Sequence, residues 1–251
     1  MHALTASDLK ELRSLHSREG RSQYNAFLVE GEKNVEELIS SGWEIKKCMT
    51  TKRFLDAHPH FIIPGEVSIA TPEQYARLTE LDTPPEISAV VTRRYSTLLD
   101  IADSPFILCC DGVSDPGNLG TIIRTADWFG VSAILLSRQG VDPFSSKVVR
   151  ATMGSLFRTK LCVSNAIIDD LTILKGKGIH IVVADALGET LVSSPQLPKP
   201  LCLVLGSEAH GAHDEIKALS HQLLAIPGAD TAESLNVAVS AGILLYALHA
   251  S

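Results

Sequence analysis

The sequence lacks the features of several common protein classes. The longest apolar segment, Val237 to Ala250, is too short to span a bilayer, and Met1 to Arg13 lacks the apolar stretch of a secretory signal. We therefore expect a soluble, cytoplasmic protein without a membrane partner. There is no Gly-x-Gly-x-x-Gly motif and no Gly-x-Ser-x-Gly elbow, which disfavours a Rossmann dinucleotide enzyme and a serine hydrolase.

An excess of positive charge is also absent. The 251 residues include 22 Lys and Arg against 29 Asp and Glu, giving a formal net charge of −7. Binding to nucleic acid would therefore depend on a local basic patch, because the overall field repels phosphate. With 45% hydrophobic residues, the chain is nevertheless long enough for one large α/β domain or two smaller ones with their own cores.

Cysteine pairs and metal-binding motifs are lacking too. The five cysteines are odd in number, scattered and mostly set in apolar runs, so we expect reduced core residues of a cytosolic protein. Several acidic and histidine side chains do crowd one region, namely Glu208, His210, His213, Asp214 and His221. Their spacing is not that of His-Glu-x-x-His and no cysteine pair assists them, so no metal site is predicted.

An alternation of short apolar runs and helical patterns is present from Phe106 onward, and it predicts an α/β fold with a mostly parallel sheet. The expected strands are Phe106–Cys110, Ala133–Leu136, His180–Ala184, Leu201–Leu205 and Leu223–Ile226. The expected helices are Leu119–Phe129, Asn165–Leu174 and Leu235–His249. Ligands bind beyond the carboxyl ends of such strands, which draws attention to the loops at Asp111, Gly206 and Pro227.

The first 95 residues differ in texture and predict a separate small α/β domain. A charged opening helix is followed by expected strands Ala26–Val29, Ile45–Met49 and Ile87–Val91 and by an expected helix Glu32–Ser40. Residues 96–105 are polar and are read as a linker, and residues 106–251 as the main domain.

Three segments follow expected strands and combine turn residues with polar side chains. They are Asp111–Ala126, with Asn118 and Arg124; Leu203–Gly211, with Glu208; and Ile226–Ser240, with Ser234 and Asn236. Each one alone also fits an ordinary turn followed by a capped helix, with Asn118 as a possible cap in the first.

In this order and spacing, the three segments resemble the motifs of the SpoU, or TrmH, family of SPOUT RNA 2′-O-ribose methyltransferases. Lys147–Arg158 is similar to the segment between the family's first two motifs, and Ser14–Ile39 looks like the L30e-like substrate-binding domain often fused before them. The resemblance implies a SPOUT (α/β knot) fold with a trefoil knot. It also implies methyl transfer from S-adenosylmethionine to a ribose hydroxyl of RNA, with ribosomal RNA favoured over tRNA. Ala209 and Gly228 depart from the family's commonest residues.

The resemblance also implies the site residues. The donor is expected at Leu205, Gly206, Ile226, Leu235 and Asn236, and the catalytic surroundings at Asn118, Arg124, Glu208, Ser234 and Asn236. A guanidinium stays protonated, so we expect Arg124 to hold the RNA phosphate and stabilise a developing alkoxide rather than act as the base.

Partners follow from the same comparison. The RNA contacts are expected at Arg13, Arg18, Arg21 and Arg124, although a solvated helix face explains the first three equally well. A homodimer is expected through the apolar residues of the last helix, Val237, Ile243, Leu244, Tyr246 and Leu248. The alternatives that stay open are a non-catalytic, ribosome-associated RNA-binding protein of the same fold, a tRNA ribose methyltransferase and a base methyltransferase.

Overall fold

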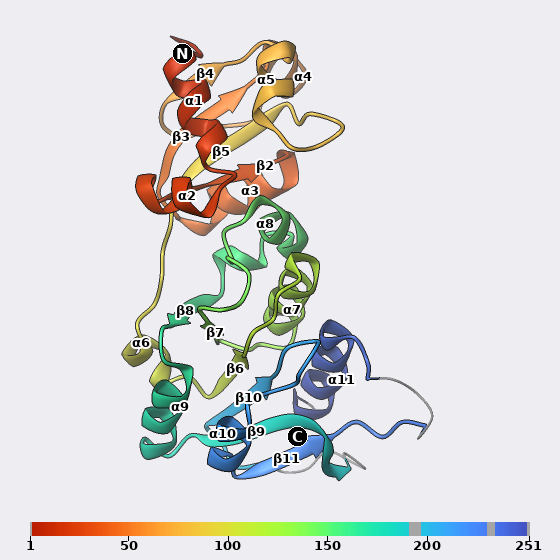
Figure 1. Ribbon diagram of the computed structural model, residues 1–251. Helices are drawn as coiled ribbons and strands as arrows, with labels where there is room; N and C mark the ends of the chain where they lie inside the picture. The colour runs from red at the N-terminus through yellow and green to blue at the C-terminus, as the bar shows by residue number, and fades with distance from the viewer. Residues whose placement is uncertain (1, 191–196, 230–233, 250–251) are drawn as a thin grey trace. The chain divides into compact units, whose positions relative to one another are not determined.

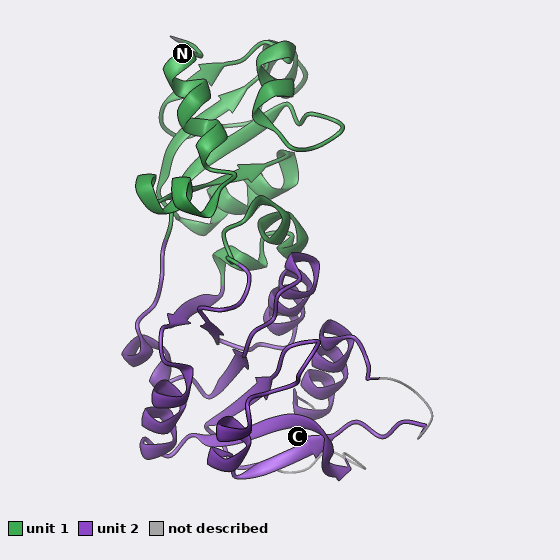
Figure 2. Ribbon diagram, in the orientation of Figure 1, with its two compact units in different colours: residues 1–93, 142–158 green, residues 94–141, 159–251 purple. Residues whose placement is uncertain are grey.

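The computed structural model describes residues 2–190, 197–229 and 234–249. The chain forms two compact units (Figure 2). The first unit consists of Met1–Arg93 and Asp142–Arg158, and the second of Arg94–Val141 and Thr159–Ser251. No helix among the described residues is long and apolar enough to cross a membrane.

This division differs from the linear one expected from the sequence. The segment Asp142–Arg158, which lies within the expected main domain, is part of the first unit. The expected linker 96–105 contains a short helix, α6 (Leu98–Ala102), whose N-terminus is capped by Thr97 and whose Ile101 is fully buried. The polar residues of this segment include those that cap the helix, and in the sequence such residues look like a linker.

The first unit is built on a mixed five-stranded sheet in the order β1-β4-β3-β5-β2 (Figure 1). Its strands are β1 (His2–Ala3), β2 (Ala26–Glu30), β3 (Ile45–Thr50), β4 (Val67–Ile69) and β5 (Ile87–Thr92). Its helices are α1 (Ala6–Ser14), α2 (Arg18–Tyr24), α3 (Glu32–Ser41), α4 (Lys52–Ala57), α5 (Pro72–Leu78) and α8 (Ser146–Thr152), with a 3₁₀ turn η1 (Ser155–Phe157). The first unit is thus a small α/β unit that residues 142–158 complete.

The expected opening helix of this unit is two helices. Thr5 and Asp8 form a capping box at the start of α1. The side chain of Ser17 accepts a hydrogen bond from the Gly20 amide and begins α2. Each cap supplies an acceptor for an amide that has no partner inside its helix, so the second cap, Ser17, begins a second helix.

The second unit contains a six-stranded sheet, all parallel, in the order β11-β9-β10-β6-β7-β8 (Figure 1). Its strands are β6 (Phe106–Cys110), β7 (Ala133–Ser137), β8 (Lys160–Ser164), β9 (His180–Thr190), β10 (Leu201–Leu205) and β11 (Gln222–Ala225). Besides α6, its helices are α7 (Pro116–Trp128), α9 (Ile167–Gly176), α10 (Asp214–Leu219) and α11 (Val237–His249). The predicted parallel α/β sheet is confirmed, with β8 as a strand that the sequence did not reveal.

Both faces of this sheet are covered. Helices α6, α9 and α10 contribute Ile101, Leu171 and Ile216 to a core that includes Ile107 and Cys109 of β6. Side chains alternate along a strand, so the intervening Leu108 and Cys110 face the other side, and both are buried. Coverage on both faces explains why the strands read as continuous apolar runs in the sequence.

The cysteines are part of these cores. All five are buried and none forms a disulfide, as predicted: Cys48, Cys109, Cys110, Cys162 and Cys202.

Candidate active site

The two central strands of the second unit, β6 and β10, end side by side. Cys110 pairs with Leu205 in the sheet register, and the amide of Asp111 donates to the Leu205 carbonyl over 2.8 Å. The loops that follow, one beginning at Asp111 and one at Gly206, therefore start at the same edge of the sheet. This edge is where parallel sheets bind their ligands.

Helix α7 begins at Pro116, two residues before Asn118. The carboxylate of Asp115 is the N-cap and accepts from the Asn118 amide over 2.9 Å, and Pro116 occupies the first helical position. The expected cap at Asn118 is wrong, because Asp115 already satisfies that amide. The Asn118 side chain is left free for contacts outside the helix.

The side chain of Asn118 links the other two motifs. Its Nδ2 donates to Glu208 Oε1 over 2.8 Å, and its Oδ1 accepts from Asn236 Nδ2 over 3.0 Å. A carboxylate only accepts, so the nitrogen of the Asn118 amide must face Glu208 and the oxygen must face Asn236. Three residues from three separate sequence motifs thus form one hydrogen-bonded chain.

Asn236 is fixed from its other end. Its Oδ1 accepts from the amides of Ala238 and Val239 over 2.9 and 3.3 Å at the start of α11. The amide orientation of Asn236 is therefore set by the helix it caps, and this orientation directs its Nδ2 toward Asn118.

Glu208 is the charged residue of the hydrogen-bonded chain Glu208–Asn118–Asn236. Partial burial raises the pKa of its carboxyl, but hydrogen bonds from Asn118 and from nearby backbone amides, including Ser114, outweigh this effect and lower the pKa. Glu208 is thus an anion at neutral pH. It brings a fixed negative charge to the loop after β10.

Gly206 lies where no side chain fits. A Cβ at this position would come within 1.9 Å of the Gly211 carbonyl carbon and 2.0 Å of the Ala212 nitrogen. The loop folds back through two hydrogen bonds between Ser207 and Gly211, which brings this backbone close. Only glycine fits this tight turn, and because glycine has no side chain a ligand can approach its main chain closely.

The other expected donor residues lie at the ends of strands and at the start of α11. Leu205 is fully buried at the end of β10, Ile226 is half-buried just after β11, and Leu235 is exposed before α11. Residues 230–233, the middle of the third motif, lie outside the described residues.

Arg124 and Ser234 are not part of the hydrogen-bonded chain. Arg124 is exposed in the third turn of α7, and neither residue forms a hydrogen bond or ion pair with any of the residues that the structure describes. Arg124 is six residues after Asn118, so it projects about 120° away around the helix. Within one chain, the guanidinium faces a different side from the amide.

The expected basic strip of the first unit is corrected at Arg21. Arg13 and Arg18 are exposed, but Arg21 is only 3% exposed and forms an ion pair with Asp142. A guanidinium buried in this way is not available to RNA phosphate, so Arg21 is not an RNA contact.

Two functional contacts at the edge of the second sheet were missed. The buried Asp111 carboxylate accepts from Nδ1 and from the amide of His213 over 2.6 and 3.2 Å. The amide and hydroxyl of Ser114 lie 3.4 and 3.5 Å from Glu208 Oε2. Asp111 and Ser114 are part of the first motif, and the sequence could have pointed to them only because they follow the end of a strand. Within the described part of the chain, no group of three or more His, Cys, Asp or Glu residues is placed to hold a metal ion.

Comparison with known sequences decides the family. The sequence profile of the SpoU rRNA Methylase family matches residues 105–246, and that of an MRM3-like substrate binding domain matches residues 6–89. The chain belongs to the SpoU rRNA methylase family.

Relatives of this SpoU protein match over nearly the full length. The 23S rRNA (guanosine(2553)-2′-O)-methyltransferase RlmP of Bacillus subtilis strain 168 is 32% identical over 244 residues, covering 96% of this chain and 95% of the relative. The structure of an AdoMet-bound rRNA methyltransferase from Sinorhizobium meliloti is 31% identical, with a TM-score of 0.86 over 100% of this chain and 97% of that one.

A further solved structure is similar, that of the SpoU methyltransferase AviRb from Streptomyces viridochromogenes in complex with AdoMet. It is 25% identical, with a TM-score of 0.84 and 98% of both chains covered. The expected SpoU family and SPOUT methyltransferase fold are therefore confirmed.

Proposed function

We propose that this SpoU protein transfers a methyl group from S-adenosylmethionine to a ribose 2′-hydroxyl of ribosomal RNA, 23S rRNA in particular. The observation that carries the proposal is the chain Glu208–Asn118–Asn236 at the carboxyl edge of β6 and β10. Relatives named as 23S rRNA 2′-O-methyltransferases support the substrate, and neighbours solved with AdoMet support the donor.

The site suits a cationic donor. When bound, S-adenosylmethionine supplies a sulfonium-activated methyl group. The main chain of Leu205 and Gly206, with Ile226, Leu235 and Asn236, would hold it. The ionised Glu208 places negative charge on the adjoining loop, which favours a sulfonium cation in a partly desolvated site.

The chain's own residues then orient the RNA. Asn118 is held at both ends, so its position is preorganised for the ribose without cost at the moment of reaction. A guanidinium offers only donors, so we assign to Arg124 the neighbouring phosphate and the alkoxide that develops at the 2′-oxygen, while the phosphate or a water takes the hydroxyl proton. Ser234 is exposed two residues before Asn236, and we assign its hydroxyl to the substrate contacts.

We assign RNA recognition to the first unit. It holds 14 Lys and Arg against 15 Asp and Glu, whereas the second unit holds 8 against 14. The negative charge is thus concentrated in the second unit, and the first unit repels phosphate far less. Arg13 and Arg18, exposed on α1 and α2, are the proposed phosphate contacts.

We further propose a homodimer that uses α11, in the cytoplasm where ribosomal RNA is modified. Of the five residues expected at the interface, Val237, Leu244 and Leu248 are buried within their own chain and are withdrawn. The exposed apolar stripe is instead Val239, Ile243 and Tyr246, which are 50%, 38% and 68% exposed. Their spacing of four and three residues places them on one helix face.

Trp128, 84% exposed at the end of α7, adds a large apolar ring to the helix that packs against α11. The Arg124 side chain projects away from Asn118 of its own chain. A dimer would therefore allow Arg124 to serve the partner's site.

The deciding experiment is methyl transfer from labelled donor to ribosomal RNA of a strain lacking the gene, followed by mapping of the 2′-O-methyl group. We expect Asn118→Ala to lower the transfer rate by about a hundredfold, the usual cost of one preorganised polar contact at a reacting centre. Gln222→Ala, which removes an exposed side-chain amide contact with Glu189 at the start of β11, should leave the rate unchanged. RNA binding without methylation by the wild-type protein would identify a non-catalytic RNA-binding protein instead.

A further inference from the structure

Asp111, the residue that follows β6, contacts both ends of the loop 206–213 within the second unit. Its amide donates to the Leu205 carbonyl over 2.8 Å, where β10 ends and the loop begins. Its carboxylate Oδ2 accepts from the His213 amide over 3.2 Å and from His213 Nδ1 over 2.6 Å, where the loop ends and α10 begins. One residue of the neighbouring strand therefore fixes the distance between the two ends of the loop.

The loop between these two ends is compact. Ser207 and Gly211 exchange two backbone hydrogen bonds of 3.0 and 2.9 Å. A Cβ at Gly206 would come within 2.0 Å of the nitrogen of Ala212, the residue before the anchored histidine. Because the start and the end of the loop lie in contact, a shift of its end also moves the main chain around Gly206 and the turn that carries Glu208.

The contact with His213 is the one that holds the Asp111 carboxylate. This carboxylate is 1% exposed, and its Oδ1 has no hydrogen-bond partner among the described residues. A buried carboxylate is costly without donors, so the two hydrogen bonds from His213 stabilise it strongly. The other acidic side chains near the imidazole, Asp214 and Glu215 of α10, are exposed.

We propose that Asp111 and His213 are positioning residues of the donor site, which keep the loop 206–213 closed around Gly206 and Glu208. The loop offers its main chain at Gly206 and its negative charge at Glu208, and Asp111 and His213 act on the donor through them. The proposal rests on the proposed function for its effect on the donor. Its structural part, the ordering of the loop by contacts with Asp111, stands without it.

The experiment compares His213→Ala and His213→Asn in the full-length protein. Alanine removes the Nδ1 donor, and because the imidazole is 60% exposed its loss leaves no cavity in the core. The amide nitrogen of asparagine branches from Cγ as Nδ1 does in histidine, so it can donate to Asp111 without a positive charge. Asparagine therefore tests whether this one hydrogen bond is what positions the loop.

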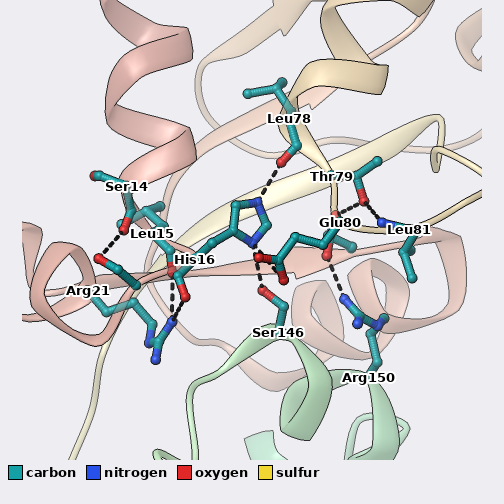
Figure 3. Close-up of polar contacts among 12 residues, drawn as sticks. Ser14, Leu15, His16, Arg21, Leu78, Thr79, Glu80, Leu81, Ser146 and Arg150 are labelled. Carbon is teal, nitrogen blue, oxygen red and sulfur yellow. Dashed lines mark hydrogen bonds and ion pairs between the residues drawn. The ribbon is translucent and has the colours of Figure 1, made fainter.

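Two controls remove comparable contacts elsewhere. Lys217→Ala removes an ion pair of 2.8 Å between α10 and Asp185 of β9, so it loosens the same helix without removing a side-chain contact of the loop. His16→Ala removes a more buried imidazole, 13% exposed, whose Nε2 lies 2.6 Å from the Leu78 carbonyl in the first unit (Figure 3). Thermal unfolding of all four variants gives the loss of stability with which donor binding is compared.

Two readouts separate positioning from a purely structural role. In His213→Ala we expect amide hydrogen exchange in residues 207–212 to accelerate about tenfold, and the affinity for S-adenosylmethionine measured by calorimetry to fall about tenfold. His213→Asn and both controls should keep these values close to those of the wild type.

The outcomes are distinct. If His213→Ala matches the controls in either readout, or if asparagine fails to restore them, the proposal is overturned. A wild-type protein that binds no S-adenosylmethionine would instead overturn the proposed function, and the exchange comparison would still decide whether Asp111 and His213 order the loop.

Discussion

At the scale of single residues, the ion pair between Asp111 and His213 joins the two loops of the active site. Asp111 is 1% exposed, and its Oδ1 has no hydrogen bond to any of the residues described, so the carboxylate depends on His213 for a counter-charge. The hydrogen bond and the charge of Asp111 raise the pKa of the His213 imidazole above its usual value, with Glu215 and Asp214 adding to the effect.

The pH dependence of stability follows from that direction. A raised pKa in the folded state means that His213 stabilises the fold fully below its unfolded pKa of about 6.5, and that this contribution is lost as the pH rises through the folded value. We expect the free energy of unfolding of His213→Gln to be lower than that of the wild type by up to about 1 kcal/mol near pH 6 and by less near pH 8.5. The difference is small because the imidazole is exposed and its charge is screened by water. Urea unfolding at both pH values measures it, and a gap that widens with pH would contradict it.

Individual residues also mark the limit of what the sequence reveals. That the loops carrying Asn118, Glu208 and Asn236 begin at one edge could be predicted from the parallel strands, but these three residues were singled out within the loops by the family resemblance. Arg21 could not be placed, because its partner Asp142 is distant in sequence and a charged residue on a short polar helix looks solvated. Arg124 was identified only by the family motif. That it projects away from Asn118 follows from the structure, in which both residues belong to helix α7.

At the scale of elements, the start of α7 controls the site. Asp115 caps the helix through the amide of Asn118, so one hydrogen bond both stabilises α7 and fixes the residue that contacts Glu208. We expect Asp115→Ala to cost about 1 kcal/mol of stability, the usual value of an N-cap, and also to slow methyl transfer severalfold.

Thr97→Ala is the control for that variant, because Thr97 caps α6 by the same kind of hydrogen bond. Chemical unfolding and single-turnover rates are measured for both. A similar loss of stability in both variants with a loss of rate only in Asp115→Ala is the expected pattern. An equal loss of rate in Thr97→Ala would mean that the site responds to general destabilisation.

Elements were predictable where periodicity was strong. The buried strands β6, β7 and β10 and helix α11 follow from their apolar patterns, whereas β9 continues to Thr190, beyond the buried half that the pattern showed. Strand β8 was missed because Lys160 is exposed and the strand lies at the edge of its sheet, so only its centre is apolar. Helix α11 is apolar on nearly all sides. The periodicity of its apolar residues therefore did not distinguish the face that is buried in its own chain from the exposed stripe.

At the scale of the whole molecule, the exposed stripe on α11 predicts the oligomeric state. We expect the wild-type protein to sediment as a dimer and Ile243→Lys to sediment as a monomer, because a charge in an apolar interface has no partner. Ile62→Lys is the matched control, since Ile62 is an isoleucine of the first unit that is 83% exposed. Monomeric wild-type protein, or dimers that survive Ile243→Lys, would place the interface elsewhere or remove it.

The division of the chain into a first unit that closes only with residues 142–158 has a consequence for biosynthesis. A ribosome delivers residues 1–93 first, then β6, α7 and β7, and only afterwards the aspartate that neutralises Arg21 and the phenylalanine that packs on Phe27. Chains that fold during synthesis usually complete their N-terminal domain before the next one begins. Here the N-terminal domain lacks Asp142 as the ion-pair partner of Arg21, and Phe144 as a packing partner of Phe27, until part of the second unit has been made. Residues 1–93 therefore do not contain the whole of the first unit, and a fragment ending before residue 158 would lack part of it.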